Sequence, residues 1–340
     1  MYRRDFLKRV VLGSAGVSSL VVLEPYFYIL DGIRQASGDL VRRTVQSMGT
    51  RVHLRAFSDG MDGSHIRSAI AEIEAVDRLM SVHRAKSDLS RVNRSAGGPV
   101  RVDPRTLEVA RAALEFAGLT NGALDPTVLP LMRYWGFMEA QGTIPEARQL
   151  GPCLDRVGYG QLRVHNEWIE LGQAEVDFGG IAKGYAVDRA VGQMRKDGMP
   201  RMLIEAGGDL YAAGRPDRDR CWQIGIRDPQ RPNRIFAIVD MEDEAAATSG
   251  GYEKFRAIGN RRVPHLLDPR TGKPAQEIIS ATLFAPTTME ADALATATYI
   301  LGVKAGLELV GQRPGVEGVW ISVDGRRWVS PGLAGRIRWV

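Results

Sequence analysis

Cysteine is scarce in this chain, with two residues among 340, and the two form no C-x-x-C pair. This count excludes a cysteine zinc site, because such a site needs several thiolate ligands at short spacing. The five histidines form no H-E-x-x-H arrangement either. Cys153 and Cys221 could still pair in an oxidising compartment, and their spacing leaves this open.

The common nucleotide fingerprints are also missing. No predicted strand leads into G-x-G-x-x-G, and Lys183 is followed by Gly184 instead of Ser or Thr, so a bound nucleotide requires another design. Of the formal charge of +5, residues 1–35 supply +2, from five basic and three acidic residues. The modest remainder argues against a nucleic-acid partner.

With 44% hydrophobic and 25% charged residues, the chain can build a substantial globular core. Apolar spacing predicts helices over residues 66–80, 107–119, 182–196 and 289–310. Strands are predicted over 41–59, 202–206, 222–227, 235–241 and 279–285, with a hairpin of 318–323 and 327–329 around Asp324-Gly325. Because these elements do not alternate as regular βαβ units, the predicted fold class is α+β.

The N-terminus reads as a targeting segment. Arg3-Arg4 precedes a moderately apolar stretch, residues 10–23, which is typical of a twin-arginine export signal. Glu24 ends this stretch before the roughly 20 apolar residues of a spanning helix, and no cysteine follows for a lipid anchor. A short anchor helix is the alternative, since no clean A-x-A cleavage site is visible. We expect residues 1–36 to direct export to the periplasm, with retention at the inner membrane if the leader is not cleaved.

Two segments carry candidate chemistry. Asp292 and Thr296 lie four residues apart on a predicted helix, so a carboxylate and a hydroxyl share one face, as a magnesium site requires. A helix cap is the alternative role for Asp292. In residues 176–188, paired glycines precede Lys183 and a new helix, which lets the backbone approach an anionic ligand. A solvated side chain is the alternative for Lys183. Together the segments suggest a magnesium-assisted site for phosphates.

These segments also belong to a set of blocks that resembles the ApbE family, the FAD:protein FMN transferases, over almost all of the chain after the leader. The blocks occur in family order: Ser47-Met-Gly-Thr50, Ser87-Asp-Leu-Ser-Arg-Val-Asn93, Gly122-Ala-Leu-Asp-Pro-Thr-Val128, 177–188, Glu205-Ala-Gly-Gly-Asp209, Thr248-Ser-Gly250, His265-Leu-Leu-Asp-Pro-Arg-Thr-Gly272 and 291–297. The resemblance implies one compact catalytic domain over residues 37–340, with mixed helices and largely antiparallel strands.

The resemblance assigns the flavin pocket residue by residue. Met48, Ala123, Leu124 and Asp125 match positions that line the FAD pocket, although plain core packing is the alternative for the first three. His83 stands where the family commonly has an aromatic residue, so its ring would have to stack in place of that residue.

Further family positions imply roles at the phosphates. The third metal ligand is a backbone carbonyl, which falls on Gly180. Asp177 would order its loop or bond the flavin or adenine, with a simple turn as the alternative. Lys183 and His265 are the catalytic candidates, His265 as a base or a phosphate contact with a pKa near neutrality, or otherwise as a structural histidine. Thr248 and Ser249, with Gly250, could hold phosphate or flavin oxygens or form a polar turn.

The reaction implied is phosphoryl transfer. FAD would be the substrate and Mg²⁺ the cofactor, and a Thr or Ser hydroxyl of an acceptor flavoprotein would attack the FMN-side phosphorus while AMP leaves. The family association points to a membrane respiratory complex subunit as the acceptor. Two alternatives remain: an FAD pyrophosphatase that uses water and yields FMN and AMP, and a non-catalytic periplasmic flavin-binding or delivery protein.

Overall fold

The structure is a computed structural model that describes residues 20–22, 27–29, 40–57, 64–138, 146–231, 233–252, 254–258 and 261–340. Most of the predicted signal segment, including Arg3-Arg4, therefore lies outside the described residues. Its described parts are two short strands, β1 (Leu20–Val22) and β2 (Phe27–Ile29). Among the helices in the described ranges, none has the length and hydropathy to cross a membrane.

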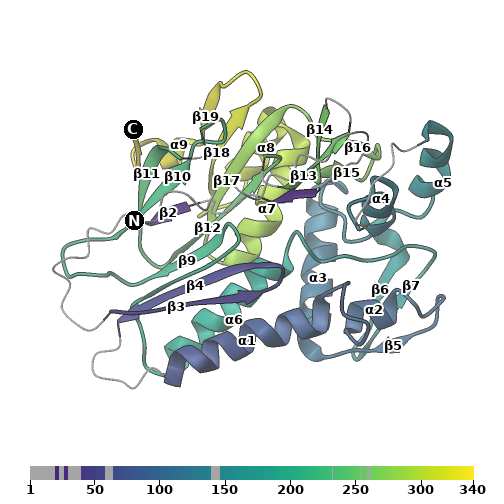
Figure 1. The fold of residues 1–340 in the computed structure, drawn as a ribbon, viewed down its shortest axis with the longest axis horizontal. Coiled ribbons are helices and arrows are strands. Elements are labelled where there is room, and N and C mark those ends of the chain that lie inside the picture. Colours follow the sequence, from purple (N-terminus) through teal and green to yellow (C-terminus); the bar gives the residue numbers. More distant parts are fainter. Residues whose placement is uncertain are drawn as a thin grey trace, which may run out of the picture.

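An eight-stranded sheet forms the centre of the molecule, in the order β19-β18-β17-β12-β9-β8-β4-β3 (Figure 1). Every pairing in this sheet is antiparallel. Its strands are β3 (Leu40–Ser47), β4 (Thr50–Phe57), β8 (Met202–Ala206), β9 (Asp209–Ala213), β12 (Glu244–Gly250), β17 (Ile278–Ala285), β18 (Glu317–Ser322) and β19 (Arg327–Val329). The prediction of an α+β fold with antiparallel strands is confirmed.

Both faces of this sheet are covered, and β8 shows how. Met202 and Ile204 pack into the core on the helical side, whereas Leu203 packs into a second core on the opposite side, because successive strand residues point to opposite faces. The helical side is covered by α1 (Ser64–Met80), α3 (Pro104–Leu119), α6 (Ala182–Lys196) and α7 (Thr288–Leu301). The other side carries the sheet β2-β10-β11-β20, with β10 (Trp222–Arg227), β11 (Ile235–Met241) and β20 (Ile337–Trp339).

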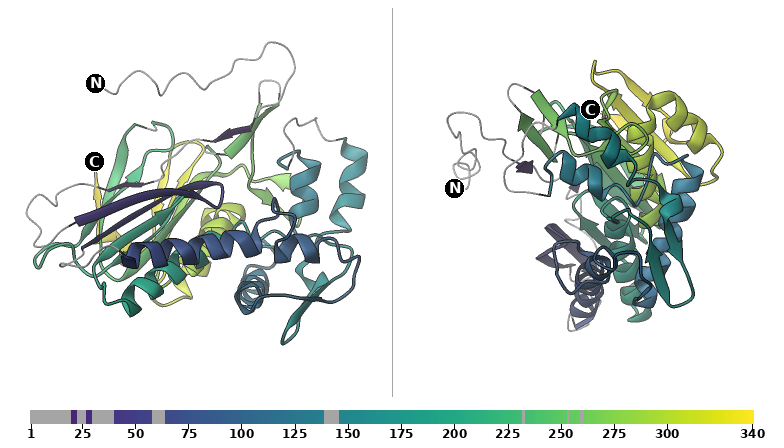
Figure 2. Two further views of the ribbon diagram at one scale, coloured as in Figure 1. Left: turned by 60° about the horizontal axis from the view of Figure 1, so that its bottom comes forward. Right: turned by 90° about the vertical axis from the view of Figure 1, so that its right-hand side faces the viewer.

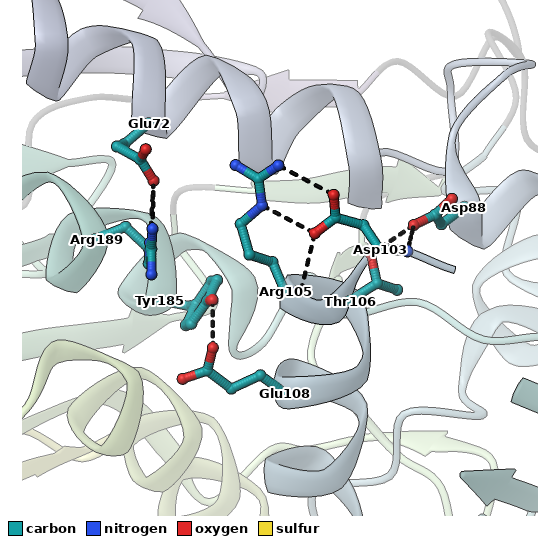
Figure 3. Close-up of polar contacts among 8 residues, drawn as sticks. All are labelled: Glu72, Asp88, Asp103, Arg105, Thr106, Glu108, Tyr185 and Arg189. Atoms are coloured by element: carbon teal, nitrogen blue, oxygen red, sulfur yellow. Dashed lines mark hydrogen bonds and ion pairs between the residues drawn. The ribbon is translucent and has the colours of Figure 1, made fainter. Parts of the chain in front are cut away.

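Polar pairs hold α6 to its neighbours on the helical side (Figure 3). Arg189 donates to Glu72 of α1 at 3.0 Å, and the Tyr185 hydroxyl donates to Glu108 of α3 at 2.6 Å. Burial and the neighbouring Glu108 carboxylate raise the pKa of Tyr185, so this hydroxyl stays protonated and can donate. Since α6 begins at the candidate phosphate loop, these pairs fix the helix that carries Lys183.

The remaining elements surround this three-layer body. Figure 2 shows α4 and α5 at one end of the molecule, away from the β10–β11 sheet. The smaller sheets have the orders β5-β7-β6, β1-β13-β14 and β15-β16. The bounds are α2 (Asp88–Val92), α4 (Leu129–Tyr134), α5 (Leu150–Leu154), α8 (Val303–Gly311), α9 (Pro331–Ala334), β5 (Val100–Arg101), β6 (Leu162–Val164), β7 (Trp168–Leu171), β13 (Lys254–Ile258), β14 (Arg261–Pro264), β15 (Leu267–Asp268) and β16 (Lys273–Pro274), with 3₁₀ turns at Ala147–Gln149 and Tyr159–Gln161.

Two predicted elements are wrong in the same way. The strand predicted over residues 41–59 is a hairpin of β3 and β4, turning at Met48 and Gly49 with φ of 53° and 71°. The helix predicted over 289–310 is two helices, α7 and α8, divided at Gly302 with φ of 85°. In both places the apolar pattern continues across a residue with left-handed backbone, and the pattern alone does not reveal the turn. The other predicted helices and strands agree with the structure to within a few residues.

Cys153 and Cys221 are both free thiols, on α5 and just before β10. The pairing that the sequence left open is therefore not formed.

Candidate functional site

One cavity of about 460 Å³ opens between the helical layer, the central sheet and the loops at the α4 end of the molecule. All thirteen residues predicted for the site line it: Met48, His83, Ala123, Leu124, Asp125, Asp177, Gly180, Lys183, Thr248, Ser249, His265, Asp292 and Thr296. They come from segments up to 248 positions apart, Met48 to Thr296, and the fold brings them to one place.

Lys183 lies between two buried carboxylates at the base of the site. Its Nζ is 2.7 Å from Asp209 Oδ2 and 3.3 Å from both oxygens of Asp292. Burial alone would lower the pKa of Lys183, but the two carboxylates more than offset it and raise that pKa. Lys183 is thus a fixed cation, and the solvated lysine considered as its alternative is wrong.

Asp209 is a site residue that the sequence prediction did not assign. It is 2% exposed, and burial together with the nearby Asp292 raises its pKa although Lys183 opposes the shift. Its position in the block Glu205-Ala-Gly-Gly-Asp209 was visible, but nothing in the sequence indicated that β9 begins beside α6. Lys183 offsets one of the two carboxylates, and a cation bound beside Asp292 would favour the ionised form of the other.

Asp292 does not cap its own helix. The N-cap of α7 is Thr287, whose Oγ1 accepts the Glu290 amide at 3.2 Å. Asp292 lies in the second turn of α7, and its Oδ2 accepts the amide of Gly184, in the first turn of α6, at 3.1 Å. The capping alternative is therefore wrong for α7, although the carboxylate does cap the neighbouring helix.

Thr296 lies one turn after Asp292 on α7, and two further residues lie close to its hydroxyl. Thr296 Oγ1 is 3.3 Å from Ser249 Oγ, and a Cβ built on Gly180 would lie 3.3 Å from the same Thr296 oxygen. A carboxylate, two hydroxyls and the backbone of Gly180 thus converge, which is the neutral and anionic oxygen mixture that Mg²⁺ prefers. Within the described residues no group of three or more His, Cys, Asp or Glu side chains has metal-binding geometry. The proposed set differs from such a group because it contains a single carboxylate.

His265 has a defined protonation state and tautomer. Its Nδ1 lies 2.9 Å from the backbone oxygen of Lys254, and a carbonyl can only accept, so Nδ1 carries the hydrogen and Nε2 is free to accept. Burial and the neighbouring Lys254 lower the pKa of His265 to about 3. The expected pKa near neutrality is wrong, because desolvation disfavours the charged ring. The imidazole is neutral at physiological pH and can accept at Nε2, although a pKa this low makes the ring of the empty site a weak base.

Asp125 and Asp177 organise the loops that form the cavity wall. Asp125 Oδ1 accepts the amide and hydroxyl of Thr127 at 2.8 and 2.6 Å, and its Oδ2 accepts the Tyr159 amide at 2.9 Å. Asp177 Oδ1 accepts the Gly179 amide at 2.9 Å, which is the loop-ordering role considered for it. Burial raises the pKa of both carboxyl groups against these hydrogen bonds. Both side-chain oxygens of Asp125 accept hydrogen bonds from the protein, so this carboxylate stabilises the loops of the cavity wall.

The remaining predicted residues form the walls. Ala123 is fully buried and Leu124 nearly so, so both pack in the core as well as lining the cavity. Met48 is half-buried at the β3–β4 turn, and His83 is exposed at the rim after α1. Thr248 Oγ1 shares a hydrogen bond with Thr282 at 2.8 Å on the adjacent strand, which restricts its availability to a ligand.

Comparison with known proteins identifies the family of the chain. The ApbE family model matches residues 48–320, and the chain therefore belongs to the ApbE family. Curated relatives named FAD:protein FMN transferase include one from Escherichia coli K12, 31% identical over 84% of this chain and 86% of the relative. Another from Treponema pallidum is 30% identical over 86% of this chain and 87% of the relative.

Solved structures give the same result. The ApbE protein of Thermotoga maritima superposes with a TM-score of 0.83 at 28% identity, covering 88% of this chain and all of that one. The flavin transferase ApbE of Vibrio cholerae gives a TM-score of 0.80 at 28% identity, covering 88% of this chain and 99% of that one. The predicted family and flavin-transferase class are confirmed.

Proposed function

We propose that this protein transfers the FMN part of FAD to a Thr or Ser hydroxyl of an acceptor flavoprotein, with Mg²⁺ as cofactor and AMP as the leaving group. The observation that carries the proposal is the convergence of all thirteen predicted residues on one cavity, with a buried Asp–Lys–Asp group at its base. The names of the family relatives support the flavin substrate.

Gly180, Asp292 and Thr296 would hold the cation, with Ser249 close enough to orient the Thr296 hydroxyl. When bound, Mg²⁺ supplies positive charge to the pyrophosphate, which lowers the barrier to attack on phosphorus. Lys183 remains paired with Asp209 at 2.7 Å, so its ammonium keeps a fixed position from which it neutralises phosphate charge.

His265 provides the base. Its free Nε2 accepts the proton of the acceptor hydroxyl while the new O–P bond forms on the FMN phosphorus. The bond from this phosphorus to the bridging oxygen breaks, and AMP leaves with that oxygen. The hydrogen bond of Nδ1 to Lys254 fixes the ring orientation, so the base is preset without a carboxylate partner.

The acceptor and the location follow from the same proposal. A twin-arginine leader would export the folded enzyme to the periplasm, where a flavoprotein domain of a membrane respiratory complex would present its hydroxyl residue.

The test is FAD-dependent labelling of an acceptor flavoprotein, followed as flavin fluorescence on a denaturing gel. Asp292→Ala should abolish labelling, because the cation would lose its only charged ligand. Thr296→Ala should retain activity at high Mg²⁺, since water can replace a neutral hydroxyl in the magnesium shell. Melting curves of both variants exclude simple unfolding.

Two results would contradict the proposal. Normal labelling by folded Asp292→Ala at ordinary Mg²⁺ would remove the metal site from this position. FAD consumption that yields only free FMN and AMP would identify water as the acceptor and the enzyme as a pyrophosphatase.

A further inference from the structure

The starts of α6 and α7 cap each other. Asp292 of α7 accepts the amide of Gly184 in the first turn of α6 at 3.1 Å. In return, Asp188 of α6 accepts the amides of Thr288 and Met289, the first two residues of α7, at 2.8 and 2.9 Å. Each helix thus receives, at its positive end, a carboxylate carried by the other helix.

Local side chains do not supply these hydrogen bonds. The N-cap of α6 is Ile181, which makes no side-chain cap hydrogen bond, and the first turn of α6 contains no acidic residue. The N-cap of α7, Thr287, uses its hydroxyl for Glu290, which leaves the two earlier amides to Asp188. The reciprocal arrangement therefore replaces local capping in α6, adds to it in α7, and fixes one helix start against the other.

Gly184 allows the two backbones to touch. A Cβ at this position would lie 2.3 Å from the carbonyl oxygen of Thr288 and 2.8 Å from Cα of Met289. These are backbone atoms that cannot move away without shifting α7. Gly184 and Asp188 are one turn apart on α6, so the close approach and the carboxylate clamp act on the same part of α7.

We propose that Asp188 is a positioning residue that sets the cation site through α7. The inference rests on the proposed function, since Asp292 and Thr296 are the ligands whose placement it controls. Asp188 holds the helix start, the Gly184 amide fixes Asp292 Oδ2, and Thr296 follows one turn later facing Ser249. Without the Asp188 carboxylate, α7 can shift relative to α6, and this shift separates Asp292 and Thr296 from Gly180. Partners beyond the ligands themselves typically contribute about 10–100-fold to metal affinity.

Asp88 offers a matched control. From α2, its Oδ2 accepts the Asp103 amide and the Thr106 hydroxyl at the start of α3, both at 2.8 Å (Figure 3). Like Asp188, this carboxylate anchors the start of a helix other than its own; it is buried and does not line the cavity. Asp88→Asn and Asp188→Asn should both lower the melting temperature, but only Asp188→Asn should affect the cation.

The experiment measures binding of Mn²⁺, a paramagnetic substitute for Mg²⁺, by electron paramagnetic resonance with the full-length protein and no FAD. Asp188→Asn should weaken binding about tenfold, while Asp88→Asn should match the wild type. Gly184→Ala, which pushes α7 away by its methyl group, should weaken binding in the same way. If Asp188→Asn does not fold, the Mn²⁺ affinity of Gly184→Ala tests whether the cation site depends on the position of α7. Amide exchange in the first turn of α7 should rise in Asp188→Asn and stay unchanged in Asp88→Asn.

Two outcomes would overturn the inference, and a third would overturn the proposed function on which it rests. Unchanged Mn²⁺ binding in Asp188→Asn, or equal weakening in Asp188→Asn and Asp88→Asn, would leave Asp188 with a purely structural role. Unchanged Mn²⁺ binding in Asp292→Ala would remove the cation site itself, and this failure belongs to the proposed function. The two kinds of failure are therefore distinguishable within one set of titrations.

Discussion

Lys183 decides whether two buried carboxylates can coexist at the base of the cavity. Its ammonium lies between Asp209 and Asp292, at 2.7 and 3.3 Å. Lys183→Met should therefore lower the free energy of unfolding by about 3–5 kcal/mol, the range found when one partner of a buried ion pair is removed. Urea unfolding at pH 7.5 measures the loss. Adding Asp209→Asn should recover most of this loss, because it removes one of the two buried carboxylates left without the ammonium.

Lys183→Met also tests whether a cation binds beside Asp292. If Mg²⁺ binds at Asp292, it should replace the missing ammonium and raise the melting temperature of Lys183→Met more than that of the wild type. A Lys183→Met protein as stable as the wild type without Mg²⁺ would show that the carboxylates are not both ionised. Equal Mg²⁺ effects in the two proteins would argue against a cation beside Asp292.

The lowered pKa of His265 predicts how the stability of the folded protein depends on pH. Burial and Lys254 hold its pKa at about 3 in the folded protein, whereas an unfolded histidine has a pKa of about 6.5. Below pH 6.5 the unfolded state therefore binds a proton that the folded state does not, and acidification favours unfolding. The wild type should lose stability relative to His265→Gln between pH 7.5 and 5. Other groups titrate alike in both proteins, so the difference isolates this ring.

Activity gives a second check on His265. Because His265→Gln lacks the base, its transfer rate should fall by about 10²–10⁴-fold while FAD binding persists. A stability difference that stays constant from pH 7.5 to 5 would contradict the lowered pKa. Loss of FAD affinity with a normal rate would make His265 a binding residue.

At the scale of elements, periodicity predicted the amphipathic helices well and missed strands of small residues. The helix over 182–196 was predicted at its observed bounds, because its buried residues recur at helical spacing. Strands β9 (Asp209–Ala213) and β12 (Glu244–Gly250) were not predicted. Both lie inside the sheet with nearly every residue buried, so their sequences show no alternation, and alanine and glycine have weak strand preference.

Gly302 explains why one predicted helix became two. Its φ of 85° suits glycine, and a Cβ there would lie 2.4 Å from Glu277 Oε2, whose partner oxygen accepts the Val303 amide at 3.1 Å. Gly302→Ala should not join α7 to α8. It should instead destabilise the protein by about 1–3 kcal/mol, the usual cost of a strained backbone position.

Urea unfolding tests this, with Gly311→Ala as the control. Gly311 ends α8, and a Cβ there meets nothing within 4 Å, so this variant should be as stable as the wild type. Asp292 lies ten residues before Gly302 in the chain, so FMN transfer at saturating Mg²⁺ should persist in both variants. A stable, longer helix in Gly302→Ala would mean that the break comes from packing and not from the backbone of this residue.

For the whole molecule, the sequence predicted which residues form the site better than what each of them does. The family blocks identified thirteen residues that all line the cavity, because proteins with the same fold place corresponding positions close together. The role of Asp209, the neutral state of His265 and the exchange of caps between α6 and α7 depend on burial and on contacts between residues 11 to 109 positions apart. No local pattern contains that information.

The leader predicted over residues 1–36 leads to a prediction about the location of the protein in the cell. We propose that Arg3-Arg4 is read by the twin-arginine export machinery, which acts as a receptor for the pair and not for charge alone. Replacing both by Lys keeps the charge and should leave the protein in the cytoplasm, whereas Arg9→Lys, outside the pair, should not affect export. Cell fractionation followed by immunoblotting measures the distribution, and extraction of the membrane fraction with alkali separates a retained leader from a released protein. Periplasmic accumulation that is equal in the two variants would contradict the twin-arginine route, and the anchor-helix alternative would then become the better explanation of residues 10–23.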